Sequence, residues 1–280
     1  MNSFNNTGKG GITRGGLASL AAAADVVSEA HAALKPKAPG ETRIVAVMAH
    51  DTNHNGVAQE YYMRTVFSSK KDWRLIFARA SGLFTPDLIS DADLLITART
   101  GIPDPIDLST DPLADSMQPG AQLWTDGNVK AIINNIRNRG MGFMALHCTL
   151  YSRNRDITDL LGVEPIMHNQ VQPIWVHDLN QDHPITSGIG RFFINLDEQF
   201  AAVIKSNSTT TLFETTAIHD KRNAIGGWCL ESGKGRIVGL LPGHTTDPYT
   251  LPEYQEILWR SAHWAMKRDI PPYPNAGKSL

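Results

Sequence analysis

Apolar runs of strand length alternate with segments of helical periodicity from residue 43 onward. Runs that are apolar throughout are typical of strands in a parallel sheet, because helices cover both of its faces. The expected strands are 43–49, 73–79, 92–98 and a run that ends at 146, and the expected helices are 57–67, 85–90 and 126–139. This alternation predicts an α/β fold with a doubly wound, mostly parallel sheet, helices on both faces and right-handed crossovers.

The second half of the chain contains more strands than helices. The pattern there predicts a helix at 157–161, strands at 170–176, 210–215, 224–230 and 237–241, and a closing helix at 253–266. Residues 102–120 carry prolines and aspartates without a period, and a loop of that length in a compact domain is usually functional or mobile. We expect a flexible N-terminal arm at 1–41, a single domain at 42–270 and a tail at 271–280.

The composition limits the classes of partner. Across 280 residues the formal net charge is -2 and no large basic cluster occurs, so neither nucleic acid nor an anionic membrane is an expected partner. No apolar stretch reaches the length of about 20 residues that a membrane helix needs. The short apolar segment at 17–24 is a poor secretory signal, and we expect an Ala-rich helix of the arm around 17–34 instead. We therefore expect a cytoplasmic protein, with export left open.

The cysteines are too few for a cysteine-based architecture. Cys148 and Cys229 are the only two, which excludes a disulfide framework and a cysteine-rich zinc module. The sequence still allows one disulfide bond between the two cysteines.

Histidines follow several of the expected strands. His147, with Cys148 after it, ends the apolar run opened by Gly140 and Gly142, and His244 ends the run 237–241 through Pro242-Gly243. His50 and His54 follow the first strand. Because ligands bind at the carboxyl ends of parallel strands, these side chains are candidates for one site.

Several short motifs occur together in a defined order. They are Gly-x-x-x-Leu-His at 142–147, His-Pro-Ile-Thr-Ser-Gly-Ile at 183–189, Asp-Glu at 197–198, Gly-Lys-Gly-Arg at 233–236, Pro-Gly-His at 242–244 and Trp-Ala at 264–265. In this order and spacing the chain resembles the ThuA-like, or trehalose utilisation, family from about residue 43 to 267. The resemblance implies a class I glutamine amidotransferase-like, flavodoxin-like α/β fold, a role in carbohydrate metabolism and, for some members, a bound divalent metal, often zinc.

The strand-end histidines have the chemistry of a zinc site. Catalytic zinc takes three protein ligands and leaves one position open, and neutral imidazoles are good ligands. We predict that His54, His147 and His244 converge, with His50 competing for the place of His54. Either Glu198 or Asp197 is expected as a further ligand or as a base, and His168 lies in a segment that could fold over the site.

Such a site suits acid/base chemistry on an oxidised sugar. In a 3-keto-glycoside the proton at C2 is acidic, and a base can remove it while a cation stabilises the enolate oxygen. Elimination, hydration or isomerisation would follow, with His147, Glu198 and His244 as the catalytic residues. A partner sugar dehydrogenase would supply the substrate, and a homo-oligomer stays open.

Other functions remain open at this point. Amidotransferases of this fold place a cysteine at the turn after the central strand, whereas here His147 holds that place and Cys148 comes one residue later, so a Cys148-dependent hydrolase or amidotransferase-like enzyme is the less favoured alternative. A non-catalytic sugar- or metabolite-binding protein of the same fold is another. Glycoside hydrolysis by two facing carboxylates is disfavoured, because the adjacent Asp197 and Glu198 would point apart.

Overall fold

The computed structural model describes residues 35–48, 53–102 and 121–275, and the backbone of 50–51. A nine-stranded sheet runs through the molecule. Its parallel half has the order β4 (Trp73–Phe77), β1 (Thr42–Val47), β5 (Leu94–Thr97), β6 (Gly142–Leu146) and β13 (Gly235–Leu240). The antiparallel half continues with β12 (Arg222–Ser232), β11 (Thr210–Ala217), β8 (Gln172–His177) and β9 (Phe192–Asp197).

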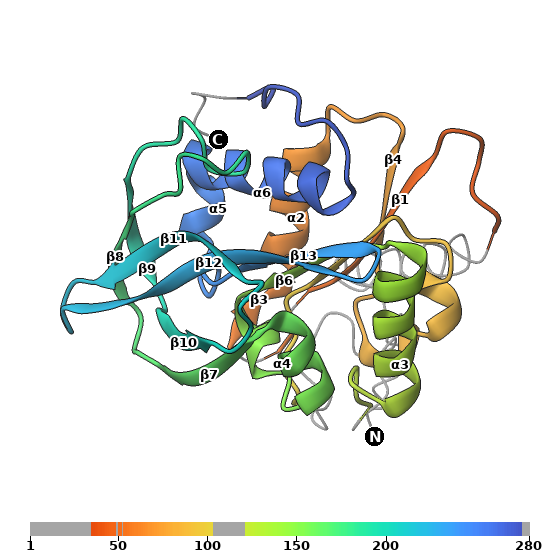
Figure 1. The fold of residues 1–280 in the computed structure, drawn as a ribbon, viewed down its shortest axis with the longest axis horizontal. Helices are drawn as coiled ribbons and strands as arrows, with labels where there is room; N and C mark the ends of the chain where they lie inside the picture. The colour runs from red at the N-terminus through yellow and green to blue at the C-terminus, as the bar shows by residue number, and fades with distance from the viewer. Residues whose placement is uncertain (1–34, 49, 52, 103–120, 276–280) are drawn as a thin grey trace, which may run out of the picture.

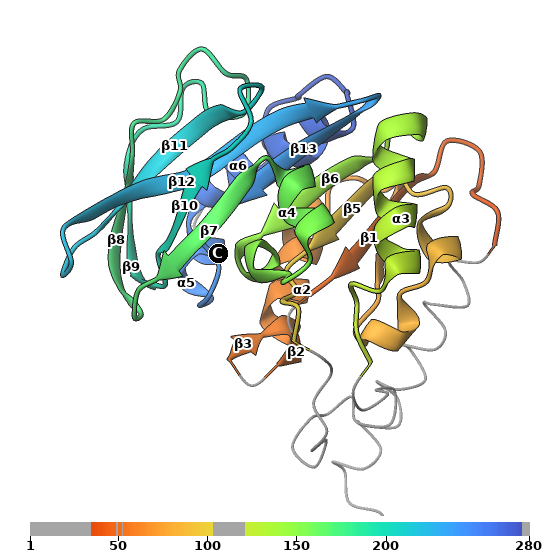
Figure 2. The same cartoon turned by 60° about the horizontal axis from the view of Figure 1, so that its bottom comes forward.

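Helices cover both faces of the parallel half (Figures 1 and 2). One face carries α2 (Gly56–Phe67), α5 (Asp247–Thr250) and α6 (Pro252–Ala265), and the other carries α3 (Asp126–Asn134) and α4 (Arg155–Leu161). Alternate residues of each strand enter opposite cores, so that in β1 Ile44 packs in the core with α2 and α6 while Val45 packs in the core with α3 and α4. The predicted α/β fold is confirmed.

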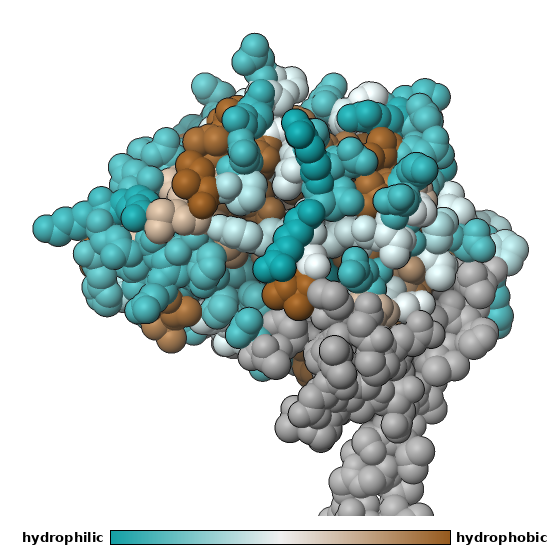
Figure 3. Space-filling view, turned by 90° about the horizontal axis from the view of Figure 1, so that it is seen from below, coloured by the Kyte–Doolittle hydropathy of each residue, from teal (hydrophilic) through white to brown (hydrophobic). Residues whose placement is uncertain are grey.

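Two smaller ladders flank the main sheet. β7 (Val163–His168) pairs antiparallel with β10 (Phe200–Ile204), and β2 (His50–Asp51) pairs with β3 (His54–Asn55). Seen from below, the surface is largely hydrophilic and its apolar side chains form separate patches (Figure 3). The exposed apolar residues of β7 and β10 are Ile166, Met167, Val203 and Ile204.

Most of the predicted elements occur close to their expected bounds, with some differences in kind. The short helix expected at 85–90 is a 3₁₀ turn at Pro86–Ile89, and the helix expected at 126–139 changes to π geometry at Asn135–Arg139. The strands β7, β9 and β10 were not predicted. In these strands several apolar side chains are exposed, so the sequence lacks the alternation that marks a half-buried strand.

The described residues also bear on three further expectations. Cys148 and Cys229 are both free and buried, so no bridge joins them. Among the helices that are described, none is long and apolar enough to cross a membrane. Beyond α6 the chain folds back onto the helix. The Trp259 indole N–H donates to the Pro271 carbonyl, and the Tyr273 hydroxyl donates to the side-chain oxygen of Gln255. The predicted arm, except for its last residues, and nearly all of the predicted loop 102–120 lie outside the described part.

Candidate functional site

His147 occupies the turn that follows the central parallel strand. Its backbone φ of 36° is unusual for a residue with a side chain, and a 3₁₀ turn, His147–Tyr151, begins there. The turn is held by Thr149, whose hydroxyl donates to the Thr97 carbonyl at 2.7 Å and accepts from the Arg99 N–H at 3.2 Å. His147, and not Cys148, therefore holds the strained position at the end of β6.

The tautomer of His147 follows from its partner. Nδ1 lies 2.8 Å from the carbonyl oxygen of Leu241, which can only accept, so Nδ1 carries the proton. Burial lowers the pKa of His147 to about 4, so the ring is neutral and Nε2 carries a lone pair. That nitrogen lies 3.5 Å from Oε2 of Glu198. A lone pair facing a carboxylate is repulsive unless a proton or a cation lies between them.

His54 and His244 meet His147 at the same point. His54 comes from β3 and His244 follows β13, and one nitrogen of each of the three rings lies within 4.8 Å of the others. Ring centroids are 4.8 to 5.4 Å apart with edge-on geometry. In a tetrahedral zinc site two ligand nitrogens are about 3.4 Å apart, so the cluster is near ligand geometry.

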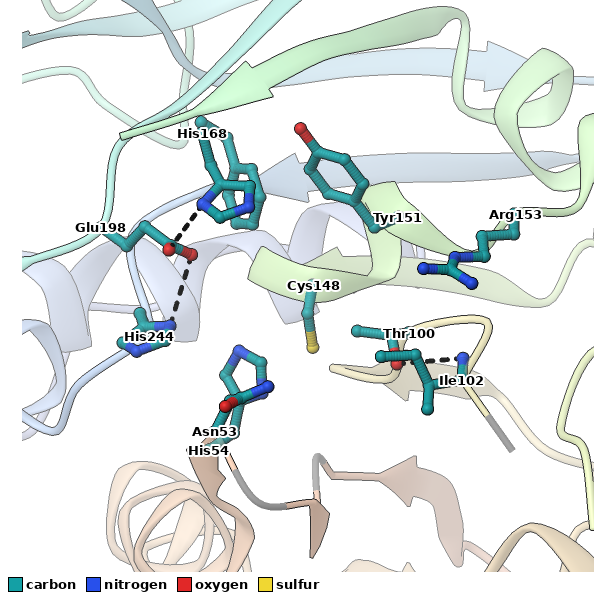
Figure 4. A pocket seen from close by; sticks show the side chains of 11 residues that line it. Asn53, His54, Thr100, Ile102, Cys148, Tyr151, Arg153, His168, Glu198 and His244 are labelled. Atoms are coloured by element: carbon teal, nitrogen blue, oxygen red, sulfur yellow. Dashed lines mark hydrogen bonds and ion pairs between the residues drawn. The ribbon is translucent and has the colours of Figure 1, made fainter. Parts of the chain in front are cut away.

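Glu198 lies between β9 and β10 and contacts three histidines, of which Figure 4 shows His168 and His244. Its Oε2 is 3.3 Å from Nδ1 of His244, and its Oε1 is 2.7 Å from Nδ1 of His168. Burial alone would raise the pKa of Glu198, but the neighbouring histidine rings, His147 and His244, lower it well below its usual range. The side chain is therefore an ionised carboxylate inside the pocket.

Asp197 does not join this cluster. It is fully buried, and its two oxygens accept from the backbone N–H groups of Gly243 at 2.8 Å and Thr245 at 3.0 Å. Burial raises its pKa to about 7. The structure thus places Asp197, which was expected as a possible ligand or base, behind the site, where it fixes the turn that carries His244.

Gly243 is required in that turn by space and by conformation. Its φ is 141°, and a Cβ at this position would lie 2.6 Å from the hydroxyl oxygen of Tyr249. The Pro-Gly-His motif therefore lets the chain pass Tyr249 closely before His244 projects into the site.

The cluster forms one side of a pocket of about 340 Å³, a size typical of small-molecule sites. Its lining residues are Asn53, His54, Thr100, Ile102, Cys148, Tyr151, Arg153, His168, Glu198, Phe200 and His244. Cys148 lies between the two sides of the pocket, and its buried thiol donates to the Ala98 carbonyl at 2.9 Å (Figure 4).

Sequence reasoning found the histidines and Glu198 but missed other lining residues. Asn53, Thr100, Tyr151 and Arg153 were not predicted. Tyr151 and Arg153 follow His147 within six positions, so their place at the same strand end was the one available signal. His168, expected in a loop, ends strand β7. His50 begins β2, and its side chain is outside the described part.

The other histidines lie elsewhere. His183 accepts from the N–H of Ile185 at 3.2 Å and so caps the backbone of its own turn. His177 belongs to a second group with Asp178 and Glu214, but its two ring nitrogens already contact Asp178 and Thr216. That group is therefore a weaker candidate for a metal.

Comparison with known proteins identifies the family. The family model described as ThuA, trehalose utilisation, matches residues 45–265. The chain belongs to the ThuA family. This membership supports a carbohydrate-related role, as the sequence predicted.

Solved structures share the fold of this ThuA chain. A protein described as ThuA-like from Parabacteroides merdae has a TM-score of 0.63 at 14% identity, covering 85% of this chain and 96% of its own. Another from Bacteroides uniformis has a TM-score of 0.59 at 15% identity, covering 82% and 93%. A β-galactosidase from Bacillus circulans sp. alkalophilus reaches 0.53 at 10% identity, covering 81% of this chain but 31% of that enzyme. No curated protein matches.

Proposed function

We propose that this ThuA-family chain is an enzyme that carries out metal-assisted acid/base chemistry on a sugar oxidised to a 3-keto-glycoside. The observation that carries the proposal is the cluster of His54, His147 and His244 beside Glu198. Three imidazole nitrogens are a donor set that zinc prefers, and the carboxylate beside them is left to act as a base. When bound there, a divalent cation would stabilise negative charge on a substrate oxygen.

The surroundings of the cluster support the fit of a cation. The Nε2 lone pair of His147 faces the Glu198 carboxylate, and a positive charge between them would turn that repulsion into attraction. The other ring nitrogen of His147 donates to the Leu241 carbonyl, the kind of outer contact that orients a ligating imidazole. Asp197 holds the His244 turn in a similar way.

A histidine that binds a cation through its lone pair cannot accept a proton with it. In this proposal His147 and His244 are ligands, and the proton-transfer roles pass to Glu198 and His168. Glu198 takes the proton from C2, because it is the carboxylate that lines the pocket beside the histidines. The C2–H electron pair forms the enolate. The C3 carbonyl then re-forms and a C1=C2 double bond forms as the C1–O bond breaks, and His168, 2.7 Å from Glu198, protonates the leaving oxygen.

The substrate follows from this chemistry. The C2 proton of an ordinary glycoside is not acidic, so a partner sugar dehydrogenase must first oxidise C3. The pocket volume of about 340 Å³ suits a monosaccharide unit. A thiol mechanism is disfavoured, since the Cys148 thiol is buried and donates to a backbone carbonyl.

Proton exchange tests the proposal directly. Protein loaded with zinc is incubated with methyl 3-keto-glucoside in D₂O, and the C2 proton is followed by NMR. We expect exchange or elimination by the parent protein and a loss of about 10²-fold or more in Glu198→Gln. Glu164→Gln is the matched control, because Glu164 is exposed on β7 and pairs with Lys205.

Two outcomes would contradict the proposal. One is a parent protein that carries zinc but neither exchanges the C2 proton nor consumes the ketone. Saturable binding without exchange would then favour a non-catalytic sugar-binding protein. The other is a Glu198→Gln variant that is as active as its parent.

A further inference from the structure

Arg153 lines the same pocket from the side opposite the histidines (Figure 4). Its guanidinium makes no hydrogen bond or ion pair with any residue that the structure describes. Both Arg153 and Arg155 are exposed, but Arg155 pairs with Asp159 on the outer face of α4. An arginine placed in a pocket without a protein partner has its hydrogen-bond donors available for a ligand.

The backbone at Arg153 is strained and firmly held. Its φ is 57°, in the left-handed region that residues with side chains rarely adopt. On one side, the N–H of Ser152 donates to the Thr149 carbonyl, and the hydroxyl of Ser152 accepts from the N–H of Asn154. Strain at a pocket-lining residue is a common feature of functional positions.

A neighbouring segment fixes the same turn from the other side. The N–H of Gly101 donates to the Tyr151 carbonyl at 2.9 Å. A Cβ on Gly101 would lie 2.0 Å from the Ser152 carbonyl oxygen, so only glycine permits this approach. The base of the Arg153 side chain is therefore positioned by two segments of chain.

The charges in the pocket are unbalanced. Among the described lining residues Glu198 is the only carboxylate, and it is engaged by three histidines. Nothing acidic in the described lining is left to neutralise Arg153. A ligand that spans the pocket therefore meets imidazoles at one end and an arginine at the other.

We propose that Arg153 binds an acidic substituent of the substrate, so that the enzyme acts on a sugar bearing a carboxylate or a phosphate. The planar guanidinium can donate two parallel hydrogen bonds to either oxyanion. The sugar part of this inference rests on the function proposed above, with the reacting carbons at the histidine side. A neutral 3-keto-glycoside would then be chemically competent but weakly bound.

Binding measurements with defined probes test the inference. Isothermal titration with glucose, glucuronate, glucose 6-phosphate and inorganic phosphate is carried out on zinc-loaded and on chelated protein. In the parent protein we expect glucuronate or glucose 6-phosphate to bind about 10- to 100-fold more tightly than glucose. The better of the two acids identifies the substituent.

Three variants separate charge from folding. Arg153→Asn removes the charge, and asparagine tolerates the left-handed conformation. We expect it to lose the preference for acids over glucose. Arg153→Lys should keep part of the preference, because it retains the charge without the planar fork. Arg155→Gln, on the exposed face of α4, should match the parent.

The results distinguish this inference from the proposed function. Three outcomes would overturn the inference: equal affinities for glucose and the acids, no saturable binding of either acid, or an unchanged preference in a folded Arg153→Asn. None of them would contradict the proposed function if the protein still binds zinc and exchanges the C2 proton. Inorganic phosphate binding as tightly as glucose 6-phosphate also overturns the inference, since the site would then be one for free anions. A parent protein that neither binds zinc nor exchanges the C2 proton, but binds an acid that Arg153→Asn no longer binds, would support the inference and contradict only the proposed function.

Discussion

Asp197 and Glu198 are neighbours in the chain, yet their carboxylates point in opposite directions. Glu198 faces the pocket and the histidines, while Asp197 faces inward and receives the N–H groups of Gly243 and Thr245. Successive residues of an extended chain point to opposite faces, which explains the division. One acid contributes to the site and the other holds the backbone that carries His244.

The first prediction concerns Asp197→Asn. An amide offers one acceptor oxygen in place of two, so one buried N–H loses its partner or meets the amide NH₂. At pH 8, above the pKa of about 7, the buried charge itself costs stability, so in the unfolding free energy its removal opposes the loss of one hydrogen bond. We expect weaker zinc binding, because the turn that carries His244 loses one of its two contacts with residue 197. Denaturant titration and zinc calorimetry measure the two effects. An exposed control, Asp178→Asn, should change neither, and an Asp197→Asn variant that binds zinc like its parent would contradict the role assigned here.

The second prediction concerns the ligands. Parent protein dialysed against zinc should retain one ion per chain, and His244→Ala or His147→Ala should lower the affinity by more than about 100-fold, since each removes a direct ligand. Metal analysis after dialysis and competition with a chelator measure the change. His177→Ala serves as the control, because His177 lies in the separate group with Asp178 and Glu214. Loss of zinc in that variant alone would move the metal to the other group.

Strand-end placement was enough to predict part of the site from sequence. His147 and His244 follow the apolar strands β6 and β13, which pair in parallel, so their convergence follows from topology alone. His54 was predicted together with His50, and the short β2–β3 hairpin that orients it has no periodic pattern. The roles of these residues as ligands stay predictions.

Other features depended on tertiary contacts that no local pattern records. His168 and Glu198 meet because β7 and β10 pair antiparallel, with His168 opposite Phe200. Both strands carry exposed apolar residues, so their sequences lack the alternation of apolar and polar residues that predicts a strand. Arg153 lines the pocket from a left-handed backbone conformation, which the sequence around it does not predict. For the side of the pocket opposite the histidines, the sequence therefore held one signal, which is the closeness of Tyr151 and Arg153 to His147 in the chain.

The third prediction compares two buried tyrosines. The Tyr254 hydroxyl donates to the Pro242 carbonyl, whereas the Tyr249 hydroxyl has no hydrogen-bond partner among the described residues. Tyr254→Phe should therefore cost about 1–2 kcal/mol of unfolding free energy, while Tyr249→Phe should be neutral or slightly stabilising. Thermal and denaturant unfolding of both variants provide the comparison. Equal losses in the two would show that the Tyr249 hydroxyl is satisfied.

The fourth prediction concerns acid stability and His263 on α6. The side chain is buried between Trp73 and Trp259, with ring centroids 4.9 and 4.8 Å away. Burial, with the nearby charges of Lys70 and Arg268, lowers its pKa to about 4, against weaker opposing effects of the Asp269 backbone and the Asp72 charge.

The sign of the pH effect follows from this lowered pKa. In the unfolded chain His263 titrates near its ordinary value of about 6.5, so between that pH and about 4 the unfolded state binds the extra proton. Stability from this residue is therefore complete above pH 6.5 and falls as the pH drops toward 4, by at most about 3 kcal/mol. His263→Phe keeps an aromatic ring between the tryptophans and removes the titration. Its unfolding free energy should fall less steeply over this window than that of the parent, while the exposed His219→Gln keeps the parental slope. Identical slopes in His263→Phe and the parent would assign the acid sensitivity to other groups.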